Sequence, residues 1–219
     1  QPLTTGFGVT ELIVKATPLI LIGVGLSIGF KANVWNIGAE GQFTMGAIAG
    51  GGTALFLNTQ ESFLVLPAVL LMGILGGIVW GMIPAFLKTK FNANEILTSL
   101  MLSYVALLIL SYLVHGPWRD PGGYNFPESE IFSDFAMLPI LLEGTRLNLG
   151  TGFALLSVLI IYILLSRTVL GYQFKVVGLA PAAAKHAGFD RAKLIWLSMI
   201  ISGGLAGLAG ISEVSGTIG

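Results

Sequence analysis

The sequence contains no cysteine and few charged residues, and both shortages exclude whole classes of protein. Without cysteine there is no disulfide, no thiolate metal site and no cysteine nucleophile. Asp, Glu, Lys and Arg make up 10% of the 219 residues, whereas soluble domains contain about a quarter. Hydrophobic residues make up 54%. Because the chain lacks the polar side chains needed to cover a surface that faces water, we expect an all-α integral membrane protein, a polytopic bundle of transmembrane helices.

Motifs for several kinds of chemistry are also missing. No P-loop (G-x-x-x-x-G-K-[ST]), no H-E-x-x-H and no G-x-S-x-G occurs. The run GGLAGLAG (203–210) lies inside an apolar stretch, where a dinucleotide-binding loop does not fit. The 11 Lys and Arg residues are sparse and equalled by 11 Asp and Glu residues, so we expect no nucleic-acid partner. We expect the chain itself to have no catalytic residue, no metal site and no cofactor.

About six segments are apolar over a membrane-length stretch, which requires roughly 20 residues for a helix. They span residues 12–30, 40–57, 63–87, 94–115, 150–167 and 194–216, and polar residues shorten the second of them. Longer polar stretches follow the fourth segment (116–149) and the fifth (168–193). We treat residues 1–219 as a single transmembrane domain. Because the chain starts at Gln1 and ends in apolar sequence, we expect it to be part of a longer protein.

The positive charges are unequally divided between the two sides that alternating segments create. One side receives Lys31, Lys88, Lys90, Arg167, Lys175, Lys185, Arg191 and Lys193; the other receives Lys15, Arg119 and Arg146. Cytoplasmic loops of membrane proteins are enriched in Lys and Arg. The sequence therefore predicts that 168–193 is a cytoplasmic loop and that 116–149 is external. This division also places His115 and His186 on opposite sides, which argues against a two-histidine metal site.

Glycines recur at a spacing of four residues in several segments. The pairs and triplet are Gly25/Gly29, Gly46/Gly50, Gly73/Gly77/Gly81 and Gly203/Gly207. On a helix this spacing leaves one face without side chains, so a neighbouring helix can approach closely in lipid. The pattern predicts tight helix contacts and carries no information about chemistry.

The polar stretch NVWNIGAEGQ (33–42) lies where the first apolar segment ends and the second begins. It contains Asn36, Glu40 and Gln42. Carboxylates near the bilayer usually face a protein interior or a watery cavity, and a helix break at that depth lines a cavity or is buried in protein. One interpretation is therefore that residues 33–42 form part of a translocation path. The other is an ordinary cytoplasmic turn, with Glu40 favoured by the positive end of the next helix. The sequence leaves both open.

Other polar residues have two interpretations as well. Glu213 lies about 28 Å along a helix counted from residue 194, so it falls in the outer half of the membrane. There it either lines a pathway or marks the outer end of the helix. Asn94 resembles an N-cap, and Glu95 follows it in the first helical turn.

The stretch GLAPAAAKHAG (178–188) predicts a short, slim helix inside the cytoplasmic loop. Pro181 suits the first helical position, where its missing N–H costs nothing, and Gly188 suits the position just after the helix. Lys185 and His186 stand near the end of the predicted helix. Such a helix fits a groove on a soluble partner and can transmit a push; otherwise it is a connecting loop with one helical turn.

Three features in this order resemble the permease subunits of bacterial ABC importers for simple sugars and nucleosides. NIGAEGQ follows FKANVW, NANEILTSLMLSY opens a later helix, and the G-x-x-P-x-A-A-x-x-A-G loop precedes a helix that runs through GGLAGLAG to Glu213. These permeases share a superfamily with the ribose and branched-chain amino acid permeases. Family members usually have eight to ten membrane helices, so the resemblance implies a middle portion of such a permease, in the bacterial plasma membrane.

The resemblance also implies partners and roles. A second permease subunit completes the pore, ABC ATPase subunits that bind ATP and Mg²⁺ dock below, an extracytoplasmic binding protein delivers substrate, and lipid surrounds the helices. The resemblance assigns ATPase coupling to Gly178, Pro181, Ala183, Ala184, Lys185, His186 and Gly188. Ala180 departs from the family pattern, in which Asn commonly stands before the proline. For a nucleoside or sugar carried by alternating access, the path residues would be Asn36, Glu40, Gln42 and Glu213. The alternative is an ion-coupled secondary transporter that uses Glu40, Glu95 and Glu213.

Overall fold

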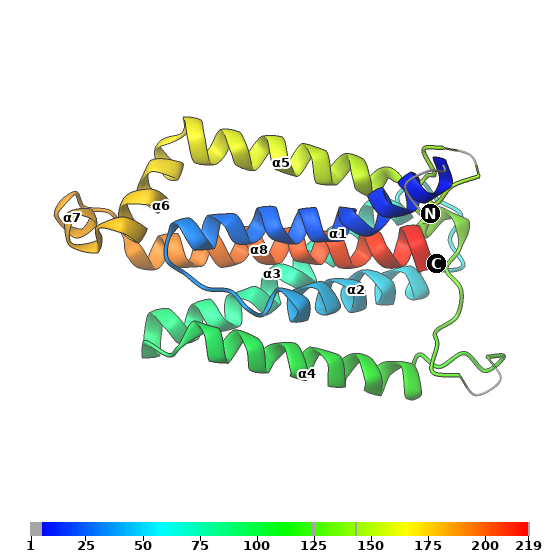
Figure 1. The fold of residues 1–219 in the computed structure, drawn as a ribbon. Coiled ribbons are helices and arrows are strands. Elements are labelled where there is room, and N and C mark those ends of the chain that lie inside the picture. The colour runs from blue at the N-terminus through cyan, green and yellow to red at the C-terminus, as the bar shows by residue number, and fades with distance from the viewer. Residues whose placement is uncertain (1–5, 124–125, 143, 219) are drawn as a thin grey trace.

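A computed structural model describes residues 6–123, 126–142 and 144–218, and helices dominate these residues (Figure 1). The helices are α1 (Gly6–Lys31), α2 (Ala39–Phe56), α3 (Val65–Phe91), α4 (Glu95–His115), η1 (Asp134–Ala136), α5 (Leu149–Arg167), α6 (Val169–Leu179), α7 (Pro181–His186), α8 (Arg191–Glu213) and η2 (Val214–Ile218). Within the described ranges the β-structure is one isolated bridge, between Ile140 and Asn148. The expected all-α architecture is confirmed.

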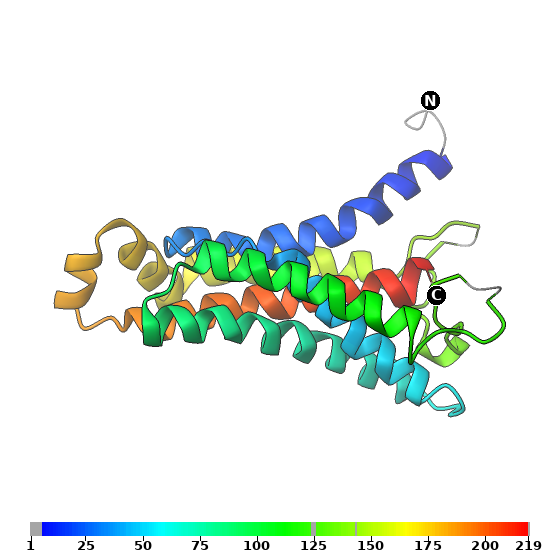
Figure 2. The same ribbon diagram turned by 90° about the horizontal axis from the view of Figure 1, so that it is seen from below.

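The six long helices lie side by side in one elongated bundle with two distinct ends (Figures 1 and 2). One end, here called the α7 end, carries α6, α7 and the turn between α3 and α4. The opposite end, here called the loop end, carries the start of α1, the end of α8 and the connection between α4 and α5. Residues 124–125 and 143 of the predicted external loop lie outside the described residues. That the α7 end faces the cytoplasm remains the prediction made from the Lys and Arg distribution.

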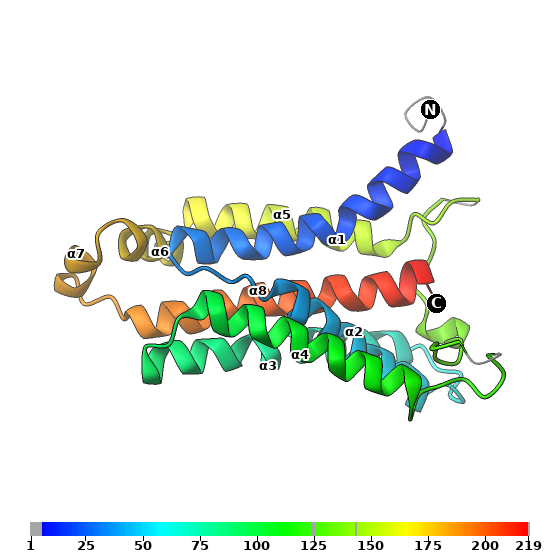
Figure 3. The same cartoon turned by 60° about the horizontal axis from the view of Figure 1, so that its bottom comes forward.

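Five of the six expected segments form helices that are long and apolar enough to cross a membrane, namely α1, α3, α4, α5 and α8 extended to Thr217. The helix α2 is not among the five. It has 18 residues, it carries Glu40 and Gln42 in its first two turns, and half of its residues are buried within the bundle. Figure 3 shows why it is short: the connection after α1 runs back along the bundle before α2 begins.

The helices α2, α3 and α8 meet backbone to backbone at the centre of the bundle. A Cβ built on Gly46 of α2 would overlap the Cα of Gly207 on α8. A Cβ built on Gly77 of α3 would likewise overlap the carbonyl oxygen of Gly203. In lipid, packing of this kind is what holds helices together, because no hydrophobic force drives one apolar helix onto another. The recurrence of glycine every four residues therefore correctly predicted close contacts between these helices.

The first glycine pair behaves differently from the others. Gly25 does meet α8, since a Cβ there would lie 3.1 Å from the Cα of Ser202. Gly29 instead faces the connection that follows its own helix, where a Cβ would lie 2.8 Å from the carbonyl oxygen of Val34. Gly29 thus allows the chain to fold back tightly after α1, and it makes no contact of the predicted helix–helix kind.

The outward faces of the bundle are apolar. On α4, Leu108 is 70% exposed, and on α5, Leu155 is 64% exposed. Contiguous apolar surface of this extent is rare on proteins that face water. The arrangement places hydrocarbon side chains where lipid tails and partner helices would contact them, which agrees with a membrane protein.

The helix α1 bends in its first half, and Figure 2 shows that its start diverges from the bundle. Pro18 lies inside this helix. Because proline has no N–H, it cannot bond the carbonyl group of Val14, and its ring crowds that turn. We attribute the bend to Pro18.

Candidate functional site

The polar connection between α1 and α2 is buried inside the bundle, anchored by Asn36. The Asn36 side chain is 3% exposed and donates to Gln42 Oε1 (2.9 Å) and to Ser202 Oγ on α8 (2.7 Å). Its Oδ1 accepts from the backbone N–H of Gly38 at 3.1 Å and from Gln42 Nε2 at 3.4 Å. Ser202 lies 11 residues into α8, or about 16 Å along it, which is roughly half of a hydrocarbon core. Of the two interpretations of this stretch, the structure supports the break inside the bundle.

Two serines of α4 satisfy backbone groups at the start of α2. Ser99 Oγ accepts from the N–H of Ile37, and Ser103 Oγ accepts from the N–H of Gly41, both at 3.2 Å. The first N–H groups of a helix have no partner within the helix, and Gly38 at the N-cap has no side chain to supply one. The Ser103 hydroxyl from the neighbouring helix therefore replaces the missing cap, and Ser99 satisfies the N–H just before the N-cap.

Sequence reasoning missed these serines, although a signal for them existed. Glu95, Ser99 and Ser103 are spaced by four, and all three are buried on the same face of α4. A polar stripe at helical spacing on an otherwise apolar helix predicts a polar partner in the bundle. The sequence does not say which segment that partner is.

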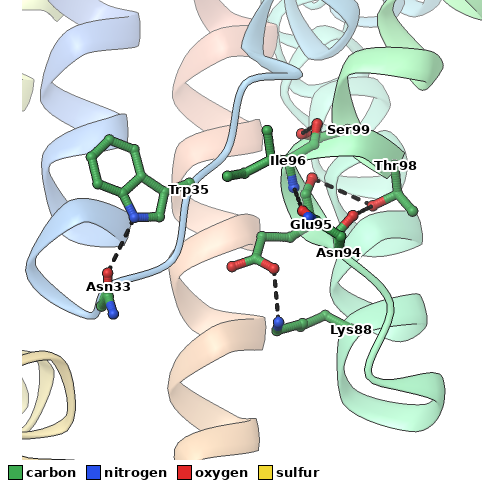
Figure 4. Close-up of polar contacts among 8 residues, drawn as sticks. All are labelled: Asn33, Trp35, Lys88, Asn94, Glu95, Ile96, Thr98 and Ser99. Carbon is green, nitrogen blue, oxygen red and sulfur yellow. Dashed lines mark hydrogen bonds and ion pairs between the residues drawn. The ribbon is translucent and has the colours of Figure 1, made fainter.

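The turn between α3 and α4 is fixed by a cap and an ion pair (Figure 4). Asn94 accepts from the N–H of Ile96 at 3.0 Å, so the predicted N-cap is confirmed. The Glu95 carboxylate pairs with Lys88 Nζ at 2.8 Å, and the backbone of Trp35 faces the same carboxylate. Glu95 thus links the turn to the connection between α1 and α2, and its charge is already compensated.

We expect Asn36→Ala to lower the free energy of unfolding by about 3 kcal/mol or more. The substitution leaves polar groups of Gln42, Ser202 and Gly38 buried without their partner, and each lost partner costs about 1–3 kcal/mol. Thermal unfolding of the purified protein in detergent measures the effect. The control is Asn33→Gly, because Asn33 is exposed and has a φ of 56° that suits glycine. Equal melting temperatures for the two variants would contradict the anchoring role.

Glu40 stands apart from this network. It lies in the first turn of α2, at the depth of the Asn36–Ser202 contact, and its side chain is exposed. The helix start favours a negative charge there, but an exposed carboxylate at mid-membrane depth is costly unless it meets a partner protein or water. Asn36 and Gln42 use their polar atoms on each other and on their neighbours. We therefore assign those two to the positioning of α2 and keep Glu40 as the candidate path residue.

Glu213 is the last residue of α8, partly buried, and remote from the Asn36 network. Eleven helical residues, about 16 Å, separate it from Ser202. Arg146 and Lys15 lie near enough at the loop end to attract its carboxylate. Among the described residues, no cluster of His, Asp and Glu is suited to hold a metal ion.

The predicted short helix exists as α7, and its ends are those that the sequence indicated. Pro181 is at its start, and Gly188 follows it with a φ of 74°. The N–H of Gly188 donates to the carbonyl of Lys185 (3.1 Å), and that of Phe189 donates to the carbonyl of Ala184 (2.9 Å). These two bonds form a Schellman motif, which ends the helix. Ala180 at the N-cap has no side-chain oxygen, so α7 starts without a side-chain cap.

The residues assigned to coupling do not all face outward. Ala183, Lys185 and His186 are exposed at the α7 end. Ala184 is 3% exposed and packs into a cluster with Phe174 and Leu194.

Gly178, on α6, is also used within the chain. A Cβ at this position would overlap the carbonyl oxygen of Lys31 at the end of α1. Glycine therefore lets α6 approach that end closely. Gly178 and Ala184 are thus contact residues within the chain, and the exposed face of α7 is what a partner can reach.

Comparison with known proteins gives a consistent result. A family model described as "Branched-chain amino acid transport system / permease component" matches residues 8–218. A glucose ABC transporter permease protein of Haloferax volcanii is 38% identical over all of this chain and 60% of its own length. A guanosine ABC transporter permease protein of Bacillus subtilis is 33% identical over 95% of this chain and 60% of its own. A probable riboflavin import permease protein of Treponema pallidum is 32% identical over 100% of this chain and 58% of its own length.

The chain spans about 60% of the length of these curated relatives. No solved structure matches the chain significantly. The family match covers nearly the whole chain, and the apolar helices agree with a multi-pass membrane protein. The chain therefore belongs to the family of permease components of branched-chain amino acid transport systems.

Proposed function

We propose that this chain is the translocating part of an ABC importer permease for a nucleoside or a simple sugar, in a bacterial plasma membrane. In this proposal the chain hydrolyses nothing itself. A separate ATPase subunit binds ATP and Mg²⁺, an extracytoplasmic binding protein delivers substrate at the loop end, and alternating access moves it to the α7 end.

The observation that carries the proposal is the way α7 is attached. Its outer face, with Ala183, Lys185 and His186, is exposed where a soluble subunit can dock. Its inner face, through Ala184, belongs to the same buried cluster as Ile28 of α1. Leu194, Ile195 and Met199 of α8 also belong to this cluster. Because packed interiors transmit strain, a displacement of α7 would move α1 and α8. This supports ATP-driven coupling through α7.

The exposed Glu40 carboxylate supports a path on the surface of α2. A single chain leaves this charge uncovered at mid-membrane depth, so the proposal requires a second permease subunit to enclose it with water or substrate. The path then runs between the two permeases, along the exposed side of α2. Glu213 lies nearer the loop end and would meet the substrate first.

The substrate class rests on the relatives. The names of the three compared permeases refer to glucose, guanosine and riboflavin. All three are uncharged at neutral pH and carry several hydroxyl groups, for which sparse carboxylates are suitable hydrogen-bond acceptors. A neutral, hydroxyl-rich molecule is therefore the class we propose.

An ion-coupled secondary transporter is the second candidate, and one contact argues against it. Of the three carboxylates that it would use, Glu95 is paired with Lys88 at 2.8 Å. A paired carboxylate holds its charge and binds a transported proton or sodium ion poorly.

The experiment that tests the function is uptake into proteoliposomes that contain the full-length permease with its ATPase and binding protein. We expect import of guanosine, adenosine, ribose or glucose to require ATP hydrolysis and to continue when ionophores remove the proton and sodium gradients. An ATPase variant that cannot hydrolyse ATP is the control and should give background uptake. Import that follows a gradient and needs no ATP would contradict the proposal.

A further inference from the structure

A cavity of about 220 Å³ lies between α2, the outer half of α4, the connection after α4 and the end of α8. Aromatic rings and a carboxylate line it together. Its lining includes Phe43, Thr44, Trp118, Ser129, Phe132 and Glu213. They come from segments far apart in the sequence, so only the tertiary fold assembles this combination.

Two adjacent glycines of α2 make room for the rings. A Cβ on Gly52 would lie 2.8 Å from the indole ring of Trp118. A Cβ on Gly51 would lie 3.4 Å from the ring of Phe132. Side chains at these two positions would push the rings away from α2. The two glycines thus let both rings approach α2 closely, at the wall of the cavity.

We propose that this cavity holds the ring of an uncharged furanose or pyranose, free or as part of a nucleoside, in the outer half of the path. The inference rests on the proposed function and names a site for it. Aromatic faces stack on sugar rings and bases, and the Glu213 carboxylate and the Ser129 hydroxyl bond to ring hydroxyl groups.

The other candidate path residue, Glu40, lies on the same face of α2 as the cavity lining. Thr44, in its lining, donates its hydroxyl to the carbonyl of Glu40 at 2.9 Å, one turn earlier on α2. Residues 44, 47, 48, 51 and 55 of α2 all line the cavity, and position 40 extends the same helix face. Glu40 lies 11 residues before Gly51, about 16 Å along the helix. The proposed cavity and Glu40 therefore lie along one face of α2.

The test uses an introduced cysteine as the labelled site. Residues 1–219 contain no cysteine, and any cysteine in the rest of the full-length permease is first replaced by serine. In the full-length permease, Ser129→Cys places a thiol in the cavity, and labelling by a membrane-impermeant maleimide is timed in the assembled complex. We expect whichever of guanosine, adenosine, ribose or glucose is imported to slow labelling at least about fivefold. The matched control is Thr59→Cys, exposed at the loop end and outside the cavity, where labelling should be unchanged.

Variants of Trp118 test whether the substrate stacks on the indole ring or only blocks access to the introduced cysteine. With Trp118→Leu, the concentration that protects Ser129→Cys should rise about tenfold, whereas Trp118→Phe should keep most of the protection. Phe126→Leu, an exposed aromatic of the same connection, should change nothing. ATP-driven uptake that persists while the imported probe gives no protection would overturn this site alone. Absence of ATP-driven uptake for all four probes would overturn the proposed function and the site with it.

Discussion

Gly207→Leu is expected to prevent the bundle from folding, and Gly207→Ala to destabilise it by about 3 kcal/mol or more. A Cβ at Gly207 would overlap the carbonyl oxygen of Gly73 and would lie 3.0 Å from the Cα of Gly77. These are backbone atoms of α3, which cannot rotate away as a side chain can. Overpacking a core costs about 1–3 kcal/mol even when side chains can yield, and total stability is only about 5–15 kcal/mol.

The measurement is the thermal unfolding of detergent-purified protein, together with the yield of monodisperse material. Gly23→Ala is the matched control, because it lies in a helix too and a Cβ there has no neighbour within 4 Å. Alanine is about 1 kcal/mol better than glycine inside a helix, so this variant should melt at the wild-type temperature or above it. If Gly207→Ala were as stable as Gly23→Ala, the backbone contact at the centre of the bundle would be wrong.

Ala183→Trp is expected to reduce ATP-driven uptake about 100-fold while leaving the permease folded. Ala183 is exposed on the outer face of α7, so the indole would occupy the space that a docked ATPase needs. Losses of about 2–4 kcal/mol at the centre of an interface correspond to this range. Co-purification of the ATPase subunit should fall with uptake, whereas the melting temperature of the permease should not change.

Two control substitutions distinguish blocked docking of the ATPase from a general effect of adding a tryptophan. Ser166→Trp adds the same ring at an exposed position of α5, at the same end but away from α7, and should retain uptake. Ala184→Trp, one residue from the test position, should instead lower stability, because Ala184 is buried against α6 and α8. Wild-type uptake and ATPase binding by Ala183→Trp would exclude α7 as the coupling element.

Local chemistry explains why much of the fold could be predicted. Apolar runs located the six long helices to within a few residues, except that α1 begins six residues before the predicted start. Asn94 was identified as a cap, and Pro181 and Gly188 were identified as the ends of α7, because caps and positive φ angles depend on neighbours in the chain. The glycine spacing predicted that helices pack closely, because positions four apart share one helix face, but it did not say which helices meet.

The candidate site was predicted less well, because its residues are defined by contacts between distant segments. Asn36, Glu40 and Gln42 stand within seven positions and were grouped as one polar path. The structure turns Asn36 and Gln42 inward, towards each other, and leaves Glu40 outside. Helix direction at the start of α2 decides this division, and nothing in the local sequence fixes that direction relative to α8.

The sequence by itself determined that this protein is a helical membrane bundle, where its helices run, and how α7 begins and ends. These properties follow from hydrophobic length and from backbone geometry, which act over a few residues. Only the tertiary structure decided that α4 serines satisfy the start of α2, that Ala184 is buried while Ala183 is free, and that Trp118, Phe132 and Glu213 share a cavity. Those properties depend on which helix faces which, and backbone contact between glycines of α2, α3 and α8 sets that arrangement.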